Sequence, residues 1–179
     1  MSITVVGISG SPSAQGSKSR VLLEHALEQL RLHQAQATLI DLAALPADGL
    51  LGRRDDAAVR HALESVLGAD IIVASTPVYR AAYTGLLKAF FDLLPQNALV
   101  GKVGVPIATG KGSAHALVGD HLFRPLFASV GAVVVSAALY GTDAQFRDGV
   151  PDQALLDGVG RAVREAVVLA AALAAGRAG

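Results

Sequence analysis

Short apolar runs alternate along the chain with longer segments whose apolar residues recur every three or four positions. In 17–32, for example, Leu23, Leu27 and Leu30 form one helical stripe. The short β-branched runs predict strands at 3–8, 37–42, 70–76, 102–109 and 132–139. Helices are predicted at 17–32, after a cap at Asp55 or Asp56, at 84–95, at 113–130 and from about Asp152 to Ala175.

Regular alternation of strand and helix predicts an α/β fold, with five parallel strands and helices on both faces of the sheet. The run 70–76 is apolar throughout, as expected of a strand that is covered on both sides. Segments 45–56 and 141–152 are predicted to be irregular. No repeat or linker interrupts the pattern, so residues 1–179 are expected to form a single domain. Ligands of such folds bind outside the carboxyl ends of the strands.

The loop after the first strand is rich in small hydroxyl side chains. Ser9, Ser11, Ser13, Ser17 and Ser19 lie within eleven residues. The free N–H groups at the start of the following helix, at the positive end of its dipole, suit an anion. Helix capping alone would explain one or two of these serines. Five of them favour a phosphate site, with a purely structural turn as the alternative.

Two nucleotide-binding motifs come close to this loop and do not fit. A P-loop needs four residues between its glycines, followed by lysine. Gly10 and Gly16 have five residues between them, and Ser17 stands where the lysine should be. Segment 104–112 also fails, and the spacing of Gly7 and Gly10 departs from the dinucleotide fingerprint. The pattern favours a phosphate monoester rather than an NTPase site.

The segment after the third strand offers a wall for a flat ligand. Pro77 makes the turn rigid because its ring fixes φ. Val78, Tyr79 and Tyr83 can supply an apolar surface, with Arg80 at its mouth. The alternative is that the two tyrosines belong to the core at a helix start.

The segment after the fourth strand, 108–115, contains two glycines and Thr109. Glycine lets backbone amides approach a ligand closely. Combined with the phosphate site and the aromatic turn, this segment predicts a slot for a heteroaromatic ring that carries a phosphorylated tail.

Composition narrows the possible functions. The formal net charge is zero, which argues against binding to nucleic acid. The chain has no cysteine, so disulfides and thiolate chemistry are excluded. The N-terminus lacks the features of a signal peptide, and the longest apolar run near the C-terminus is too short to span a bilayer, so a cytoplasmic protein is expected. The histidines lack HExxH spacing, and no metal site is predicted.

Three stretches together resemble the NADPH-dependent FMN reductase family of the flavodoxin-like superfamily. They are GSPS with SKS after the first strand, TPVYRAAYTGLLKAFFDLLPQNALVGK, and PIATGKGSAHAL. The likeness is strongest over 69–126, and closest to the flavin-reductase components of two-component alkanesulfonate monooxygenases. The resemblance implies a flavodoxin-like three-layer sandwich that uses NAD(P)H to reduce FMN, and a partner monooxygenase that receives the reduced FMN.

The resemblance implies, position by position, which residues bind the cofactor. It implies no catalytic acid or base, because hydride passes directly from the nicotinamide to the flavin. The phosphate would be held by Ser9, Ser11, Ser17, Ser19 and Arg20. The isoalloxazine would be bordered by Pro77, Val78, Tyr79 and Arg80, and its pyrimidine edge by Thr109, Gly110, Lys111 and Gly112. The family usually has Thr-Gly-Gly after the fourth strand, and here Lys111 stands in place of the second glycine. Similar reductases carry a π-bulge at the position of His121, which spacing alone does not reveal.

Several points stay open at this stage. The excess of large apolar residues in 84–95 suggests that this segment contacts a second subunit of a dimer or tetramer. The alternative is that the monomer buries these residues. The candidates are Phe90, Phe91, Leu93 and Leu94. Rival functions are an FMN-bound quinone, azo-dye or metal-ion reductase, a noncatalytic electron carrier, and a phosphate-binding regulatory domain. The choice between NADH and NADPH is also open.

Overall fold

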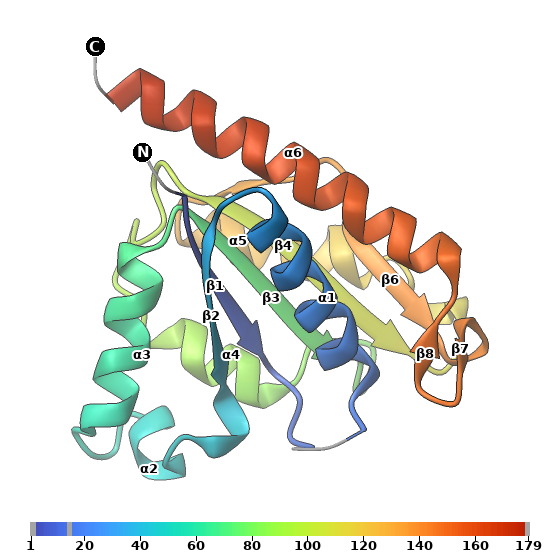
Figure 1. The fold of residues 1–179 in the computed structure, drawn as a ribbon. Helices are drawn as coiled ribbons and strands as arrows, with labels where there is room; N and C mark the ends of the chain where they lie inside the picture. The colour runs from blue at the N-terminus through green and yellow to red at the C-terminus, as the bar shows by residue number, and fades with distance from the viewer. Residues whose placement is uncertain (1–2, 14–15, 178–179) are drawn as a thin grey trace.

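The apolar runs form one parallel sheet between two layers of helices (Figure 1). The computed structural model describes residues 3–13 and 16–177. The strands are β1 (Thr4–Ser9), β2 (Gln36–Asp41), β3 (Ile71–Pro77), β4 (Val103–Gly110), β5 (Val133–Val134) and β6 (Leu139–Thr142). Their order is β2-β1-β3-β4-β5, with β6 also beside β4. This is the flavodoxin-like strand order, and the predicted fold class is confirmed.

Helices cover both faces of the sheet, as predicted (Figure 1). On one face lie α1 (Lys18–Leu32) and α6 (Gln153–Arg177), and on the other α3 (Ala57–Gly68), α4 (Gly85–Asp92) and α5 (Arg124–Ser129). Neighbouring residues of β1 serve the two cores in turn: Val5 packs with α1 and α6, whereas Val6 packs with α3 and α4. Of the two candidate caps before α3, Asp56 is the one that accepts from the helix N–H groups.

The fifth predicted strand is not continuous, which corrects the expectation for 132–139. β5 pairs with the start of β4, and β6 pairs with its end, with a break between them. Long-range side chains explain this break. The Ser136 N–H donates to Glu165 at 2.7 Å, and Arg124 donates to the carbonyls of Val135 and Ser136. The backbone there is satisfied without the ladder.

The predicted helix 113–130 is also broken. It consists of the 3-10 turn η2 (Ser113–His115), the π-helical turn η3 (Gly119–Phe123) and α5. His121 therefore does lie in a π-helical turn. Pro125, four residues later, cannot donate to the His121 carbonyl, which favours a wider turn here.

The two segments predicted to be irregular contain short elements. Segment 45–56 contains α2 (Ala47–Leu50), which follows the 3-10 turn η1 (Leu42–Ala44). After β6 come the 3-10 turn η4 (Asp143–Gln145) and a hairpin of β7 (Phe146–Arg147) and β8 (Val150–Pro151). Asp148 and Gly149 turn the hairpin with positive φ angles of 51° and 82°, a typical two-residue hairpin turn.

Most of the large apolar residues of segment 84–95 are buried inside the chain. Of the four candidates, Phe90, Phe91 and Leu94 are buried in the same core cluster, whereas Leu93 is partly exposed, as is Leu86. The monomer therefore accounts for the apolar excess that suggested a second subunit. Over residues 3–13 and 16–177, no helix has both the length and the apolar character needed to cross a membrane.

Candidate functional site

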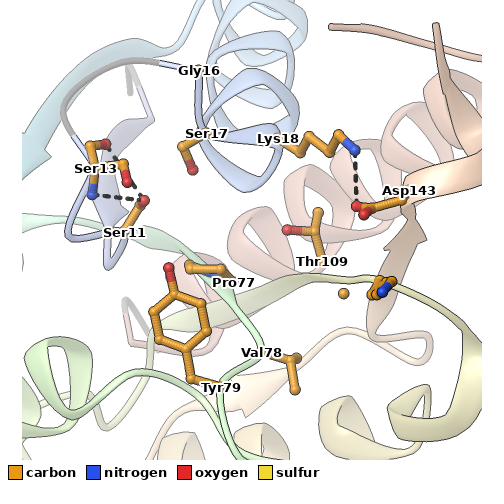
Figure 2. Close-up of a pocket in the computed structure, with 12 residues that line it drawn as sticks. Ser11, Ser13, Gly16, Ser17, Lys18, Pro77, Val78, Tyr79, Thr109 and Asp143 are labelled. Carbon is orange, nitrogen blue, oxygen red and sulfur yellow. Dashed lines mark hydrogen bonds and ion pairs between the residues drawn. The ribbon is translucent and has the colours of Figure 1, made fainter.

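A pocket of about 320 Å³ opens at the carboxyl ends of β1, β3 and β4, where the sequence predicted the ligand crevice (Figure 2). Residues from the three predicted loops line it, together with one residue from the segment after β6. They are Ser11, Ser13, Gly16, Ser17, Lys18, Pro77, Val78, Tyr79, Thr109, Gly110, Lys111 and Asp143.

The serine loop forms one end of this pocket, which we call the phosphate end after the group that the sequence predicts there (Ser11, Ser13, Gly16, Ser17 and Lys18). Ser17 is the N-cap of α1, and its hydroxyl accepts from the Arg20 N–H at 3.4 Å. The Ser11 hydroxyl accepts from the Ser13 N–H at 3.2 Å. Most N–H groups of the first helical turn have no partner within the helix, so this end offers neutral donors together with the helix dipole.

The start of the serine loop is held firmly against β3 and α4. The Gly10 N–H donates to the Ser75 carbonyl at 2.8 Å, and the Thr84 hydroxyl donates to the Gly10 carbonyl at 2.6 Å. A Cβ on Gly10 would come within 2.8 Å of Leu87, so the loop passes too close to α4 for a side chain. Beside it, the buried hydroxyl of Ser9 has no hydrogen-bond partner among the described residues.

The aromatic wall is a strained turn after β3. The backbones of Tyr79 and Ala82 exchange two hydrogen bonds, at 2.9 and 3.1 Å. Between them, Arg80 and Ala81 have positive φ angles of 52° and 63°, which non-glycine residues adopt at a cost. This turn leaves Tyr79 half exposed at the pocket, with 51% of the residue's surface accessible.

The glycine loop after β4 is tied to both neighbours. The Val78 N–H donates to the Thr109 carbonyl at 2.7 Å, which joins the aromatic turn to the glycine loop. The Tyr140 hydroxyl donates to the Gly112 carbonyl at 2.8 Å, and a Cβ on Gly110 would overlap that hydroxyl. Burial, with a smaller contribution from the charge of Asp143, raises the pKa of Tyr140. Sequence reasoning missed Tyr140, whose contacts depend on the pairing of β6 with β4.

An ion pair closes one side of the pocket. Lys18 Nζ lies 2.8 Å from Asp143 Oδ1 (Figure 2). The same Nζ is 5.4 Å from the centre of the Phe146 ring. Asp143 was not predicted, because the two residues are 125 positions apart and nothing in the local sequence links them.

Eight of the thirteen predicted site residues line the pocket: Ser11, Ser17, Pro77, Val78, Tyr79, Thr109, Gly110 and Lys111. The other five lie outside its lining: Ser9, Ser19, Arg20, Arg80 and Gly112. Ser9 and Ser19 are buried behind the loop, whereas Arg80 and Gly112 are exposed.

Arg20 is engaged elsewhere. Its guanidinium pairs with Glu24 at 2.9 Å and with Asp41. The hydrogen bond to Glu24 is the largest cause of a raised pKa of Arg20; partial burial opposes it and Asp41 adds to it. Within the described residues, no group of three or more acidic or histidine side chains is arranged to hold a metal ion.

Comparisons with known proteins agree with this geometry. The sequence pattern of the family described as NADPH-dependent FMN reductase matches residues 3–146. An FMN reductase (NADPH) from Pseudomonas putida is 38% identical over 142 residues, which are 79% of this chain and 72% of that protein. NADH-dependent FMN reductase SfnF from Pseudomonas fluorescens is 37% identical over 150 residues, 82% of this chain and 80% of that protein.

A solved structure extends the match to the whole fold. The apo form of the NADH:FMN oxidoreductase EMOB matches with a TM-score of 0.85 and 34% identity, covering 96% of this chain and 90% of that one. The matched sequence pattern includes all three loops of the pocket and ends just after Asp143. The chain belongs to the NADPH-dependent FMN reductase family.

Proposed function

We propose that this protein transfers hydride from NADH or NADPH to FMN in the pocket at the carboxyl ends of β1, β3 and β4. The relatives, named FMN reductases, support this activity. The observation that carries it is the pocket itself, in which a donor-rich phosphate end lies beside an aromatic turn and a glycine loop.

The donors in this pocket fit FMN. A phosphate monoester needs several hydrogen-bond donors, which the phosphate end supplies as hydroxyls and first-turn amides. A flat ring needs an apolar face with donors at its edge, and Tyr79 and Thr109 stand in the right loops for both.

We propose the following roles for the predicted residues. Ser11 and Ser17 bind the phosphate, while Ser9, Ser19 and Arg20 support the loop from behind. Pro77, Val78 and Tyr79 border the ring, and Thr109 and Gly110 meet its pyrimidine edge. The exposed positions at the mouth then face the nicotinamide dinucleotide: Arg80, Lys111 and Gly112.

When FMN is bound, its ring supplies the hydride acceptor. The chain positions and shields the reactants. The hydrogen-bonded turn around Tyr79 fixes one wall before any ligand arrives, which reduces the entropy lost on binding. Backbone amides near Gly110 stabilise the negative charge that grows at the edge of the ring. No acid or base side chain is required of the protein.

Reduced FMN then leaves for a partner monooxygenase. The likeness to two-component sulfonate systems supports this step. Both nicotinamides are included because the relatives are named after NADPH and after NADH. Assembly as a dimer or tetramer is part of the same proposal, and light scattering of the purified protein measures it directly.

The test mixes protein, FMN and each nicotinamide under nitrogen and follows the loss of flavin absorbance. Rapid loss with added FMN supports the proposal. No loss with either nicotinamide contradicts it and favours an electron carrier. Protein that is purified yellow and reduces quinones without releasing flavin would indicate an FMN-bound reductase instead.

The phosphate assignment has its own test. Ser17→Ala should weaken FMN far more than riboflavin, which lacks the phosphate. Ser65→Ala, on α3, is the matched control because its hydroxyl only caps a carbonyl of its own helix. Equal weakening of both flavins by Ser17→Ala would contradict the assignment.

A further inference from the structure

The charges around the phosphate end are balanced rather than positive. The two cations at the start of α1, Lys18 and Arg20, are both paired with carboxylates. Arg20 pairs with two of these, Glu24 and Asp41, and does not line the pocket. A dianion bound at this end therefore meets hydroxyls, amides and Lys18, which already has a partner, while the other lysine of the pocket lining, Lys111, belongs to the glycine loop.

That partner lies in the same pocket as the expected phosphate. Both Lys18 and Asp143 line the pocket, and Figure 2 shows them joined above Thr109. Lys18 Nζ is 2.8 Å from Asp143 Oδ1. A phosphate that takes a hydrogen bond from this ammonium must share it with a carboxylate of the same sign as itself.

Asp143 is the fixed member of the pair. It begins the turn η4, which a capping box holds in place: the Thr142 N–H and hydroxyl both contact the Gln145 side chain at 3.1 Å. Lys18 instead reaches the pair on a long flexible stem from the first residue of α1. The turn that carries Asp143 is therefore fixed, whereas the Lys18 side chain has the freedom to reorient toward a bound phosphate.

We infer that Asp143 weakens the hold of this pocket on the FMN phosphate and so keeps the flavin exchangeable. This inference rests on the proposed function, since it places the phosphate at this end. It deepens that function by naming the residue that makes FMN a dissociating substrate rather than a resident cofactor. A reductase that hands on its reduced flavin needs such a limit on affinity, because slow release would restrict turnover.

The test compares FMN and riboflavin binding, by quenching of flavin fluorescence, in four variants. Asp143→Asn should tighten FMN about fivefold at low salt, because it removes a like charge and frees Lys18. Riboflavin affinity should not change. Lys18→Met should weaken FMN, and the double variant should return close to wild type. Asp148→Asn removes a carboxylate that does not line the pocket and serves as the matched control.

The outcomes separate this inference from the proposed function. Tighter FMN binding in Asp143→Asn, with slower release of reduced FMN, supports it. Unchanged or weaker FMN binding in Asp143→Asn overturns it. If Ser17→Ala at the same time weakens FMN more than riboflavin, the phosphate assignment still holds. If neither Asp143→Asn nor Ser17→Ala changes FMN binding relative to riboflavin binding, the phosphate binds elsewhere. Both this inference and the phosphate assignment then fail. Thermal melting checks that each variant is folded.

Discussion

The two ends of the pocket are built differently. We call the turn 76–84 the ring end of the pocket, after the ligand proposed for it. Many hydrogen bonds hold it, through the hydroxyls of Thr76 and Thr84 and the paired backbones of Tyr79 and Ala82. At the phosphate end, the hydroxyls of Ser11 and Ser17 contact their own loop through a few longer bonds of 3.0 to 3.4 Å.

We therefore expect the ring end to determine which ligand shape fits, and the phosphate end to determine how tightly the ligand binds. The ring end is held by its own hydrogen bonds, so we expect it to bind a flat ligand at little entropic cost. The phosphate end keeps its donors available but offsets its lysine with a carboxylate. A rigid ring end and a charge-balanced phosphate end together suit an enzyme that must recognise its flavin and then release it.

The largest effect is expected from Thr84→Val. The Thr84 hydroxyl caps α4 through the Leu87 N–H and donates to the Gly10 carbonyl, so its loss leaves a buried acceptor unpaired. The free energy of unfolding should fall by about 2 kcal/mol, measured by urea denaturation. Thr38→Val, at an exposed position of β2, is the control. Equal stability of the two variants would show that the ring end is not held in this way.

Gly110→Ala should come next. The added Cβ would overlap the Tyr140 hydroxyl and displace either that side chain or the glycine loop. The value of kcat/KM for FMN reduction should fall about tenfold, which equals about 1.4 kcal/mol. Gly68→Ala, where nothing lies within 4 Å of the new Cβ, should leave activity unchanged. Full activity of Gly110→Ala would mean that the loop adjusts freely.

Ala81→Gly tests the strain in the aromatic turn. Glycine adopts the positive φ of this position without cost, so stability should rise by about 0.5 kcal/mol. Both FMN and riboflavin should bind about twofold more weakly, because the wall is less fixed. Ala171→Gly, at an exposed position of α6, should instead lower the melting temperature. A fall in melting temperature for both variants would contradict stored strain at Ala81.

The smallest effect concerns pH. The folded chain raises the pKa of Tyr140 above its ordinary value of 10, so the folded state holds this proton more tightly than the unfolded state. The resulting stability is fully present below pH 10 and is lost as the pH rises through the folded pKa. Unfolding followed from pH 9 to 11 should show a steeper decline for wild type than for Tyr140→Phe. If the stabilities of the two proteins fall in parallel over this pH range, the Tyr140 proton makes no such contribution to stability.

Local periodicity was enough to predict most of the fold. Strands and helices follow from which positions are apolar, and such patterns depend only on neighbours in the chain. The strand order then brings the loops of β1, β3 and β4 together, which is why eight predicted site residues meet in one pocket. Resemblance to a family supplied the flavin, which no spacing of residues could name.

Only the tertiary structure decided the features that depend on distant partners. β5 and β6 separate because Arg124 and Glu165 satisfy the backbone between them. Lys18 faces Asp143 because η4 folds back beside α1, and Tyr140 meets the glycine loop through the pairing of β6 with β4. Interactions between residues far apart in sequence leave no local pattern, so charge balance at the pocket became visible only once the chain was folded.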